Sequence, residues 1–516
     1  MCRINKTLIV LSLIIGLFNI TCNAQGFPPR RGPFEGNRPD GGMGREAIRN
    51  GDREGKVQLP MPPVTTTSSF DRALMDVKKD SPFGFFDPNM MRFQHLSFYR
   101  DFASVMNDME AYWASFGATF SFGWALIQKK NPDGSYKESY WERHDRLIKS
   151  AQAHNIHIIG IIVASEPITG EQKGRIMPSL PKDLEGYKRF VKEVVERYDG
   201  DGKEDMPGLE YPVKYWLIED EPMWRMYFNG TGSDYAVVLD AAYEAVKSAD
   251  PGANVICAML REVGNKASSQ PRAFMEDFFK KLAESGNKRP YDIIDQHWIG
   301  GEDIYRQYSF YKEIIEDIDS TARKHGFTSV PFFALEIAGP HNATEEIQAA
   351  DLLRRYAILL SFGVKKILWS GVRAAPEMGL NREQMDNYFG RVTLIKGDGE
   401  KKPAYWTYKL MVKMLDGSDW DKTEFLQAED GVYVFKFIKN GMPVWVVCNN
   451  NGNESKIKID AGDDIKTAQV IKAVPEEKYG KDSADYLNLF RHEELSVKEG
   501  ILEINIGEIP LIITGK

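Results

Sequence analysis

Apolar positions along the chain follow two different patterns. From about residue 80 to residue 370, short runs that are apolar along their whole length alternate with longer stretches in which apolar residues recur with the period of a helix. The eight short runs are candidate strands at 83–86, 118–122, 157–164, 214–218, 254–259, 293–297, 332–335 and 366–369. Candidate helices lie between them near 101–115, 141–154, 183–198, 234–249, 271–285, 308–325 and 345–361.

The continuous apolar strands indicate how the first part of the chain folds. A run such as IHIIGIIVA at 156–164 needs cover on both faces, which parallel strands receive when helices wrap the sheet. Eight strand–helix units in series predict an α/β fold, a (β/α)8 TIM barrel, over residues 76–418. In such barrels the chemistry is found at the carboxyl ends of the strands.

The pattern changes after a last aromatic-rich helix, predicted at 402–415. Runs of period two follow at 431–438, 443–449, 455–459, 466–471 and 501–506, separated by residues that form turns. They predict a small C-terminal antiparallel β-sandwich over 419–516. Its favoured role is to buttress the barrel, with glycan binding as the alternative.

The N-terminal segment reads as a leader followed by a spacer. Residues 1–24 combine two positive charges, an apolar run at 8–18 and a small residue, Ala24, at the cleavage position of a signal peptide. We therefore expect an exported protein, periplasmic or extracellular, with a lipid anchor at Cys22 as the less favoured alternative. Residues 25–75 are rich in Gly, Pro and Arg and are predicted to be a disordered linker. No later segment is long enough and apolar enough for a transmembrane helix.

Composition narrows the choice of partners. The net charge is −8, which argues against nucleic acid, whereas 10 Trp and 22 Tyr provide rings of the kind that stack on sugars. Only Cys257 and Cys448 lie outside the leader, so no structural disulfide is expected. No cofactor or metal is predicted, because the chain lacks HExxH, GxSxG and phosphate-loop motifs. The acidic loop at 199–205 is interpreted as a turn in preference to a calcium site.

Two candidate strands end in carboxylates that stand far apart in the sequence. The fourth reads YWLIEDEP and reaches Glu221 just before a proline, and the seventh reads FFALE and reaches Glu336. Cleavage of a glycosidic bond requires two carboxyl groups flanking the anomeric carbon. Glu219, two residues before Glu221, is interpreted as a buried support.

This arrangement resembles the clan A retaining glycoside hydrolases of the family 39 or family 5 type, and the first strand, SPFG at 81–84, is similar to that of family 39 and its relatives. The resemblance implies that Glu221 is the acid/base and Glu336 the nucleophile of a glycosidase that forms a covalent glycosyl-enzyme intermediate. Its substrate would be an oligosaccharide or polysaccharide of a plant or host. The clan usually has Asn before the acid/base, where this chain has Asp220; the change implies an altered 2-substituent on the sugar, a shifted pH optimum or lost activity.

Other residues at or just beyond strand ends are candidates for substrate binding. Beside Asp220, these are His297, Trp298, Trp369, Trp124 and Glu166. For His297 and Trp369 the alternative is ordinary core packing. Glu166, which also precedes a proline, is the rival for the acid.

Two other functions stay open at this stage. One is a non-catalytic carbohydrate-binding protein on a degenerate barrel, which Asp220 suggests, and the other is a transglycosidase, which uses the same two carboxylates. Retention requires carboxyl groups about 5–5.5 Å apart. The sugar, exo or endo action and the oligomeric state are not predicted.

Overall fold

The computed structural model describes residues 70–87, 96–117, 120–170, 176–258, 269–286, 289–300, 307–340, 343–373, 392–429, 431–476 and 485–516. The predicted signal peptide and most of the predicted linker lie outside these residues, so export stays a prediction. Residues 72–75, also assigned to the linker, instead form the start of helix α1 (Arg72–Lys78), where the side chain of Met75 is buried. Within the described ranges, no helix has both the length and the apolar character needed to cross a membrane.

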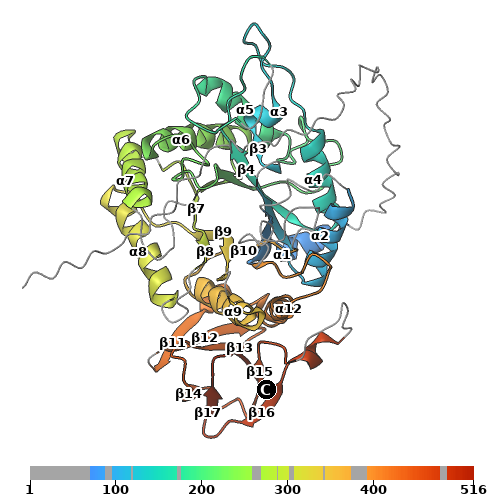
Figure 1. Cartoon of the computed structure of the whole chain (residues 1–516), viewed down its shortest axis with the longest axis vertical. Helices are drawn as coiled ribbons and strands as arrows, with labels where there is room; N and C mark the ends of the chain where they lie inside the picture. The colour runs from blue at the N-terminus through green and yellow to red at the C-terminus, as the bar shows by residue number, and fades with distance from the viewer. Residues whose placement is uncertain are drawn as a thin grey trace, which may run out of the picture. The chain divides into compact units, whose positions relative to one another are not determined.

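Eight parallel strands of the described chain close into a barrel (Figure 1). They are β1 (Phe83–Asp87), β2 (Trp113–Phe116), β4 (His157–Val163), β5 (Tyr215–Ile218), β6 (Asn254–Cys257), β7 (Ile293–Asp295), β9 (Phe332–Ala338) and β10 (Ile367–Ser370). The barrel closes because β10 pairs with both β9 and β1. Two short strands, β3 (Phe122–Gly123) and β8 (Trp298–Ile299), extend it at the carboxyl ends of β4 and β9. The predicted TIM barrel is therefore confirmed.

Helices surround the barrel as the apolar periodicity predicts. They are α2 (Leu96–Asp108), α3 (Trp124–Ile127), α4 (Glu142–Ala153), α5 (Leu184–Glu196), α6 (Gly232–Ala249), α7 (Ser269–Glu284), α8 (Gln307–Lys324), α9 (Glu345–Ser361) and α12 (Pro403–Leu415). Side chains cap several of their first turns. Asp183 accepts from the backbone N–H of Gly186, and Thr231 forms a capping box with Asp234.

The prediction of the second strand was wrong. The pattern placed it at 118–122 and extended the preceding helix to 115, but α2 ends at Asp108 and β2 spans Trp113–Phe116. The helix stops because Glu110 takes a positive φ of 53° and the N–H of Ala111 bonds back to the carbonyl of Met106. This is a helix-ending geometry that usually requires Gly, so the sequence carries no stop signal there. Residues 118–119 lie outside the described part of the chain.

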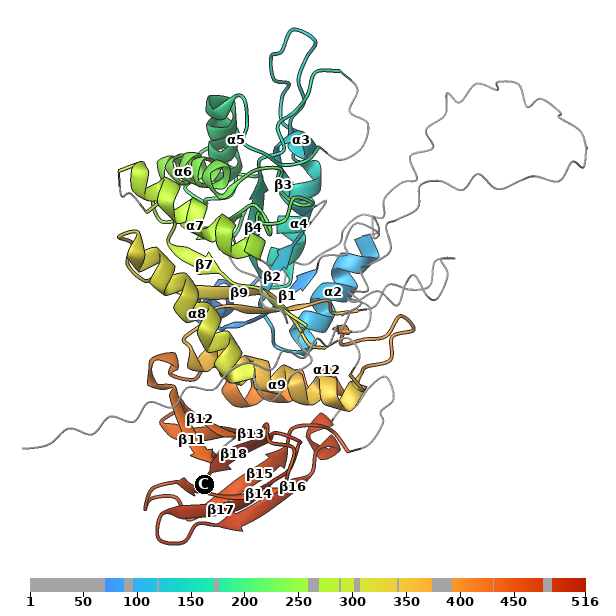
Figure 2. The same cartoon turned by 60° about the vertical axis from the view of Figure 1, so that its left-hand side comes forward.

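The C-terminal region forms two antiparallel sheets, in agreement with the predicted sandwich (Figure 2). One sheet contains β11 (Glu424–Glu429), β12 (Val432–Lys439), β13 (Met442–Asn449), β15 (Thr467–Lys472), β16 (His492–Ser496) and β18 (Leu511–Gly515), and the other pairs β14 (Ser455–Asp460) with β17 (Ile501–Ile506). Two short 3-10 helices, η4 (Trp420–Lys422) and η5 (Tyr486–Leu489), complete the region.

The sandwich is bonded to the barrel through α12 and α9. Thr407 on α12 donates to the carbonyl of Ala473, and the guanidinium of Arg354 on α9 donates to the carbonyl of Glu508. The two cysteines remain free and buried, Cys257 in β6 and Cys448 in β13, as predicted. These contacts favour the buttress role for the sandwich.

A lysine is buried at the start of β10, at the end of the barrel opposite the predicted site. Lys366 Nζ donates to the carbonyl of Lys79 at 2.8 Å and lies 4.6 Å from the centre of the Trp113 ring. Burial lowers the pKa of Lys366 to about 7, although Asp80 and Asp416 oppose the shift. The folded protein therefore releases this proton at a lower pH than the unfolded chain does.

We expect Lys366→Met to change how stability depends on pH. From about pH 7 to the pKa of an unfolded lysine, near 10.4, the unfolded chain holds the proton and the folded protein does not, so this residue makes stability rise with pH. The stability difference, variant minus parent, should therefore be larger at about pH 7 than at about pH 10. The change in this difference should be on the order of 1–3 kcal/mol. Urea titrations at both pH values measure this difference, and an equal difference at both would contradict the prediction.

Candidate active site

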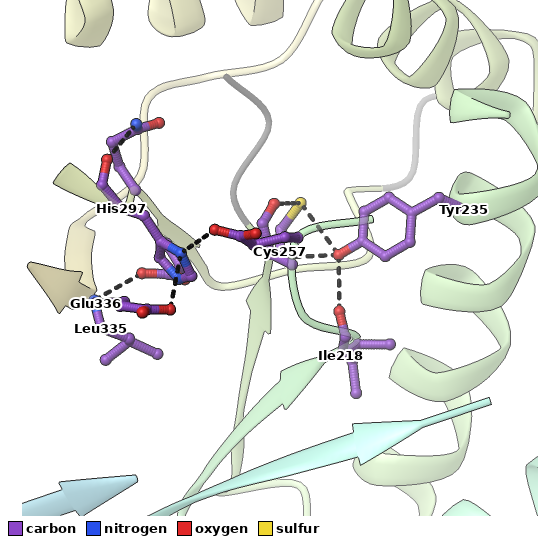
Figure 3. A network of polar contacts seen from close by, with 10 residues as sticks. Ile218, Tyr235, Cys257, His297, Leu335 and Glu336 are labelled. Carbon is purple, nitrogen blue, oxygen red and sulfur yellow. Dashed lines mark hydrogen bonds and ion pairs between the residues drawn. The ribbon is translucent and has the colours of Figure 1, made fainter. Parts of the chain in front are cut away.

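The carboxyl ends of β5, β7 and β9 bring together three of the predicted residues. Glu221 follows β5, His297 follows β7, and Glu336 lies inside β9 near its end. His297 Nδ1 is 3.1 Å from Glu221 Oε1 and 3.6 Å from Glu336 Oε2. Figure 3 shows the imidazole with Glu336 beside it. One ring nitrogen thus contacts both of the carboxylates that the sequence singled out.

Asp295 holds the other side of the imidazole. Its Oδ2 lies 2.8 Å from His297 Nε2, and its Oδ1 accepts from the backbone N–H of Leu335 at 2.8 Å. The second contact ties the end of β7 to β9, one residue before Glu336. Asp295 therefore fixes the orientation of His297 relative to the strand that carries Glu336.

The backbone turns sharply between the end of β5 and Glu221. Glu219 and Glu221 both have positive φ, 62° and 48°, a conformation that costs a side chain-bearing residue about 1–2 kcal/mol. Glu219 is buried and accepts from the N–H of Ala164 at 2.6 Å, and its own N–H donates to Ile162. Glu219 is thus buried and supports the site, as the sequence suggested. It reaches this position through the turn and not as part of an extended strand.

Tyr235 on α6 anchors the start of the same turn. Its hydroxyl donates to the carbonyl of Ile218, the last residue of β5, at 3.0 Å and accepts from the N–H of Ala258, just after β6, at 2.7 Å (Figure 3). Removing this oxygen leaves two buried backbone groups without that partner.

We expect Tyr235→Phe to lower the free energy of unfolding by about 1–3 kcal/mol, the cost of buried polar groups that lose a hydrogen bond. Tyr243, on the same helix and only partly buried, is the matched control, and Tyr243→Phe should change stability by less than about 0.5 kcal/mol. Chemical denaturation of both variants measures the difference. Equal effects of the two substitutions would show that the hydroxyl of Tyr235 does not anchor the turn.

Two residues of the site have pKa values far from their ordinary range. Burial lowers the pKa of His297, but Asp295 outweighs burial and, together with Glu221, raises it well above its usual value. Burial also raises the pKa of Glu336 well above its usual value; the positive charge of His297 opposes this shift, and Glu221 adds to it. These shifts favour the charged form of the imidazole and disfavour the ionised form of the carboxyl group beside it.

Asp220 completes the site. One of its carboxylate oxygens, a His297 ring nitrogen and a Glu336 carboxylate oxygen all lie within 4.8 Å of one another. A trio of this composition has the donor atoms of a divalent metal site. A second acidic group consists of Glu196, the last residue of α5, with Asp199 and Asp201 of the loop that follows, where Asp201 also pairs with Lys203 at 2.9 Å.

The structure does not bring Trp124 or Glu166 into this site. The Trp124 ring is buried and stacks on Tyr136 and on Phe190 of α5, so it faces the outer helices. Glu166 accepts from Lys130 Nζ at 2.7 Å through one oxygen and from the N–H of Lys182 at 2.7 Å through the other. The predicted stacking of Trp124 on a sugar is therefore wrong, whereas Glu166 is held by Lys130 and Lys182.

The two other tryptophans are also packed inside the protein. Trp298 stacks on Tyr311 of α8, and the guanidinium of Arg355 lies 4.4 Å from its ring centre, so the indole points into the helical layer. Trp369 is fully buried in β10 and donates from its indole nitrogen to the carbonyl of Val392. The packing interpretation of Trp369 holds, and neither indole presents an open face for a sugar.

Sequence reasoning missed Asp295 and Tyr235. Asp295 had a readable signal, because residues two apart in a strand share a face and Asp295 stands two before His297. Tyr235 had none, since its place on a helix predicts burial but not which strand end its hydroxyl reaches.

Comparisons with known proteins identify the fold. No protein-family model matches the sequence. No curated protein matches it either. Solved structures similar to this chain include a glucosidase from Croceicoccus marinus (TM-score 0.55, 14% identity, covering 80% of this chain and 91% of that one). A GH39 beta-xylosidase from Caulobacter crescentus is also similar (TM-score 0.55, 15% identity, 85% and 97%).

A third similar structure is a family 51 alpha-L-arabinofuranosidase from Bifidobacterium longum (TM-score 0.57, 12% identity, covering 84% of this chain and 95% of that one). At these identities the similarity shows the fold alone. The predicted resemblance to a clan A barrel with a C-terminal sandwich is thus confirmed for the architecture.

Proposed function

We propose that this protein is a retaining glycoside hydrolase in which Glu336 is the nucleophile and Glu221 the acid/base. The observation that carries the proposal is the shared contact of Glu221 and Glu336 with His297 Nδ1, at 3.1 and 3.6 Å. The sum of these distances limits the separation of the two oxygens to about 6.7 Å, which includes the about 5–5.5 Å of retaining enzymes and excludes most of the about 6.5–9.5 Å of inverting ones.

The chemistry assigned to each carboxyl group follows from its surroundings. Glu336 attacks the anomeric carbon while Glu221 protonates the departing oxygen, and Glu221 then takes a proton from the water that releases the sugar. The side chain of Glu221 is 15% exposed and that of Glu336 only 6%, so the group that exchanges protons with water is the more accessible one. His297, oriented by Asp295, supplies the positive charge that favours the ionised form of the buried nucleophile.

The raised pKa of Glu336 predicts the acidic limb of the pH profile. A nucleophile must be ionised, so activity falls as the pH drops through its pKa. Because the pKa of Glu336 is raised, kcat/KM should decline at a pH clearly above about 4.5, the usual pKa of a glutamate. A pH profile of kcat/KM checks this, and full activity down to about pH 4 would contradict it.

A second candidate function, carbohydrate binding without hydrolysis, is favoured by the same raised pKa. A raised pKa disfavours the ionised form of Glu336 that a nucleophile needs, and the residue before Glu221 in this chain is Asp220 rather than Asn. A transglycosidase would use the same carboxylates and differ only in excluding water.

The proposed substrate is an O-glycoside within an oligosaccharide or polysaccharide of plant or host origin. This substrate class rests on the resemblance to clan A enzymes and on the neighbouring structures, which are described as a glucosidase, a xylosidase and an arabinofuranosidase. The predicted leader favours action outside the cytoplasm.

A panel of aryl glycosides tests the function. We expect release of the aryl group from at least one member, with the first-formed sugar keeping its anomeric configuration in proton NMR. An inverted first product would contradict the retaining mechanism. Binding of the panel without release would favour the non-catalytic alternative, and transfer to an added alcohol with no release to water would identify a transglycosidase.

A further inference from the structure

The site is rich in acidic residues. Asp220, Glu221, Asp295 and Glu336 meet around one imidazole. All four residues are acids, so the site favours a positive charge.

The orientation of His297 suits it to ligate a metal. Asp295 Oδ2 lies 2.8 Å from Nε2 as an ion-pair partner, and Nδ1 faces Glu221 and Glu336. Metal-binding histidines characteristically donate their second ring N–H to a carboxylate, which sets the tautomer and strengthens the ligating nitrogen. Asp295 places a carboxylate beside Nε2 from outside the trio formed by Asp220, His297 and Glu336.

Glu336 provides the second observation. Its residue is 4% exposed, and its Oε1 has no hydrogen-bond partner among the residues that the structure describes. A buried carboxylate oxygen without a partner is costly, and a cation bound beside it would remove that cost.

We propose that Asp220, His297 and Glu336 form a binding site for a divalent cation of the zinc type. One nitrogen and two carboxylate oxygens within 4.8 Å of one another suit Zn²⁺, which accepts imidazole and carboxylate ligands together. The cation takes the place of the proton that Nδ1 otherwise shares with Glu221. Because the cation binds beside the proposed catalytic carboxylates, Glu221 and Glu336, it prevents the sugar from binding there. It therefore acts as a reversible inhibitor rather than as a cofactor.

The binding claim does not depend on the proposed function, whereas the inhibition claim rests on it. Calorimetric titration of the chelator-treated full-length chain with zinc chloride should show one site. Asp220→Asn, which keeps the shape of the side chain and removes its charge, should weaken binding at least about 10-fold. Asp295→Asn, which perturbs only the support of His297, should weaken it by about 10- to 100-fold.

The loop after α5 supplies a matched control. Asp201 belongs to the other acidic group of the described chain, so Asp201→Asn should leave zinc affinity unchanged. No zinc binding by the parent, or binding that Asp201→Asn removes and Asp220→Asn does not, would overturn the proposal. Thermal melting without metal verifies that each variant is folded. If Asp220→Asn is not folded, Glu336→Gln takes its place and should likewise weaken zinc binding.

If the parent hydrolyses an aryl glycoside, zinc should inhibit it in competition with substrate at the concentration that half-fills the calorimetric site. Zinc binding with no hydrolysis by any preparation would reject the proposed function and keep the metal site. Hydrolysis unaffected by saturating zinc would place the metal elsewhere and overturn the inference.

Discussion

Replacing Glu336 by alanine should lower kcat/KM for every hydrolysed aryl glycoside by at least about 10³-fold, because no covalent intermediate can form without the nucleophile. The effect should not depend on the leaving group, since the carboxylate attacks the sugar in every case. Steady-state assays of the parent and the variant across several aryl leaving groups measure it.

Azide identifies which step the substitution removed. A small anion entering the space left by Glu336→Ala attacks the sugar directly, so it should restore turnover and give a glycosyl azide of inverted configuration. Glu336→Gln, which keeps the volume of the side chain, should be equally inactive without rescue. Glu166→Gln is the control, because Glu166 is held in an ion pair with Lys130 and contacts neither His297 nor Glu336 in any described interaction, and it should retain activity. If Glu336→Ala hydrolysed aryl glycosides at the parental rate, the nucleophile would be another group.

Replacing Glu221 by alanine should have an effect that depends on the leaving group. For poor leaving groups, which require protonation, kcat/KM should fall by about 10²–10⁴-fold, the usual contribution of general acid catalysis. For a dinitrophenolate, which departs without a proton, formation of the intermediate should be nearly unchanged and its hydrolysis should become slow. A burst of released phenol in rapid-mixing experiments detects the accumulated intermediate.

Azide again separates the roles. With Glu221→Ala it should attack the covalent intermediate and give a glycosyl azide of retained configuration, the opposite of the product expected with Glu336→Ala. Loss that is equal for good and poor leaving groups would show that Glu221 does not act as the acid. The rival acid, Glu166, should show no dependence on the leaving group when it is replaced.

The architecture was readable from the sequence because its signals are long and repeated. Continuous apolar runs such as 157–164 and the alternation after residue 430 specify parallel and antiparallel sheets without reference to tertiary contacts. The second strand was the exception. The end of α2 depends on Glu110 in a left-handed conformation, which only the packing around it stabilises.

The site was only partly readable. A strand end predicts which edge of the barrel a residue occupies, and this was enough to bring Glu221, His297 and Glu336 together. It does not predict whether a side chain turns toward the barrel axis or toward the surrounding helices. Trp124 and Trp298 turn outward and pack on α5 and α8, so their position in the sequence was misleading.

The central claim is that Glu336 forms a covalent bond to the sugar, and mechanism-based 2-deoxy-2-fluoro glycosides test it most directly. After inactivation by whichever sugar of the panel reacts, mass spectrometry of the digested protein should locate one added fluoroglycosyl group on the peptide containing Glu336. Attachment to any other carboxylate, or turnover of a substrate while no fluorosugar ever becomes attached, would contradict the account.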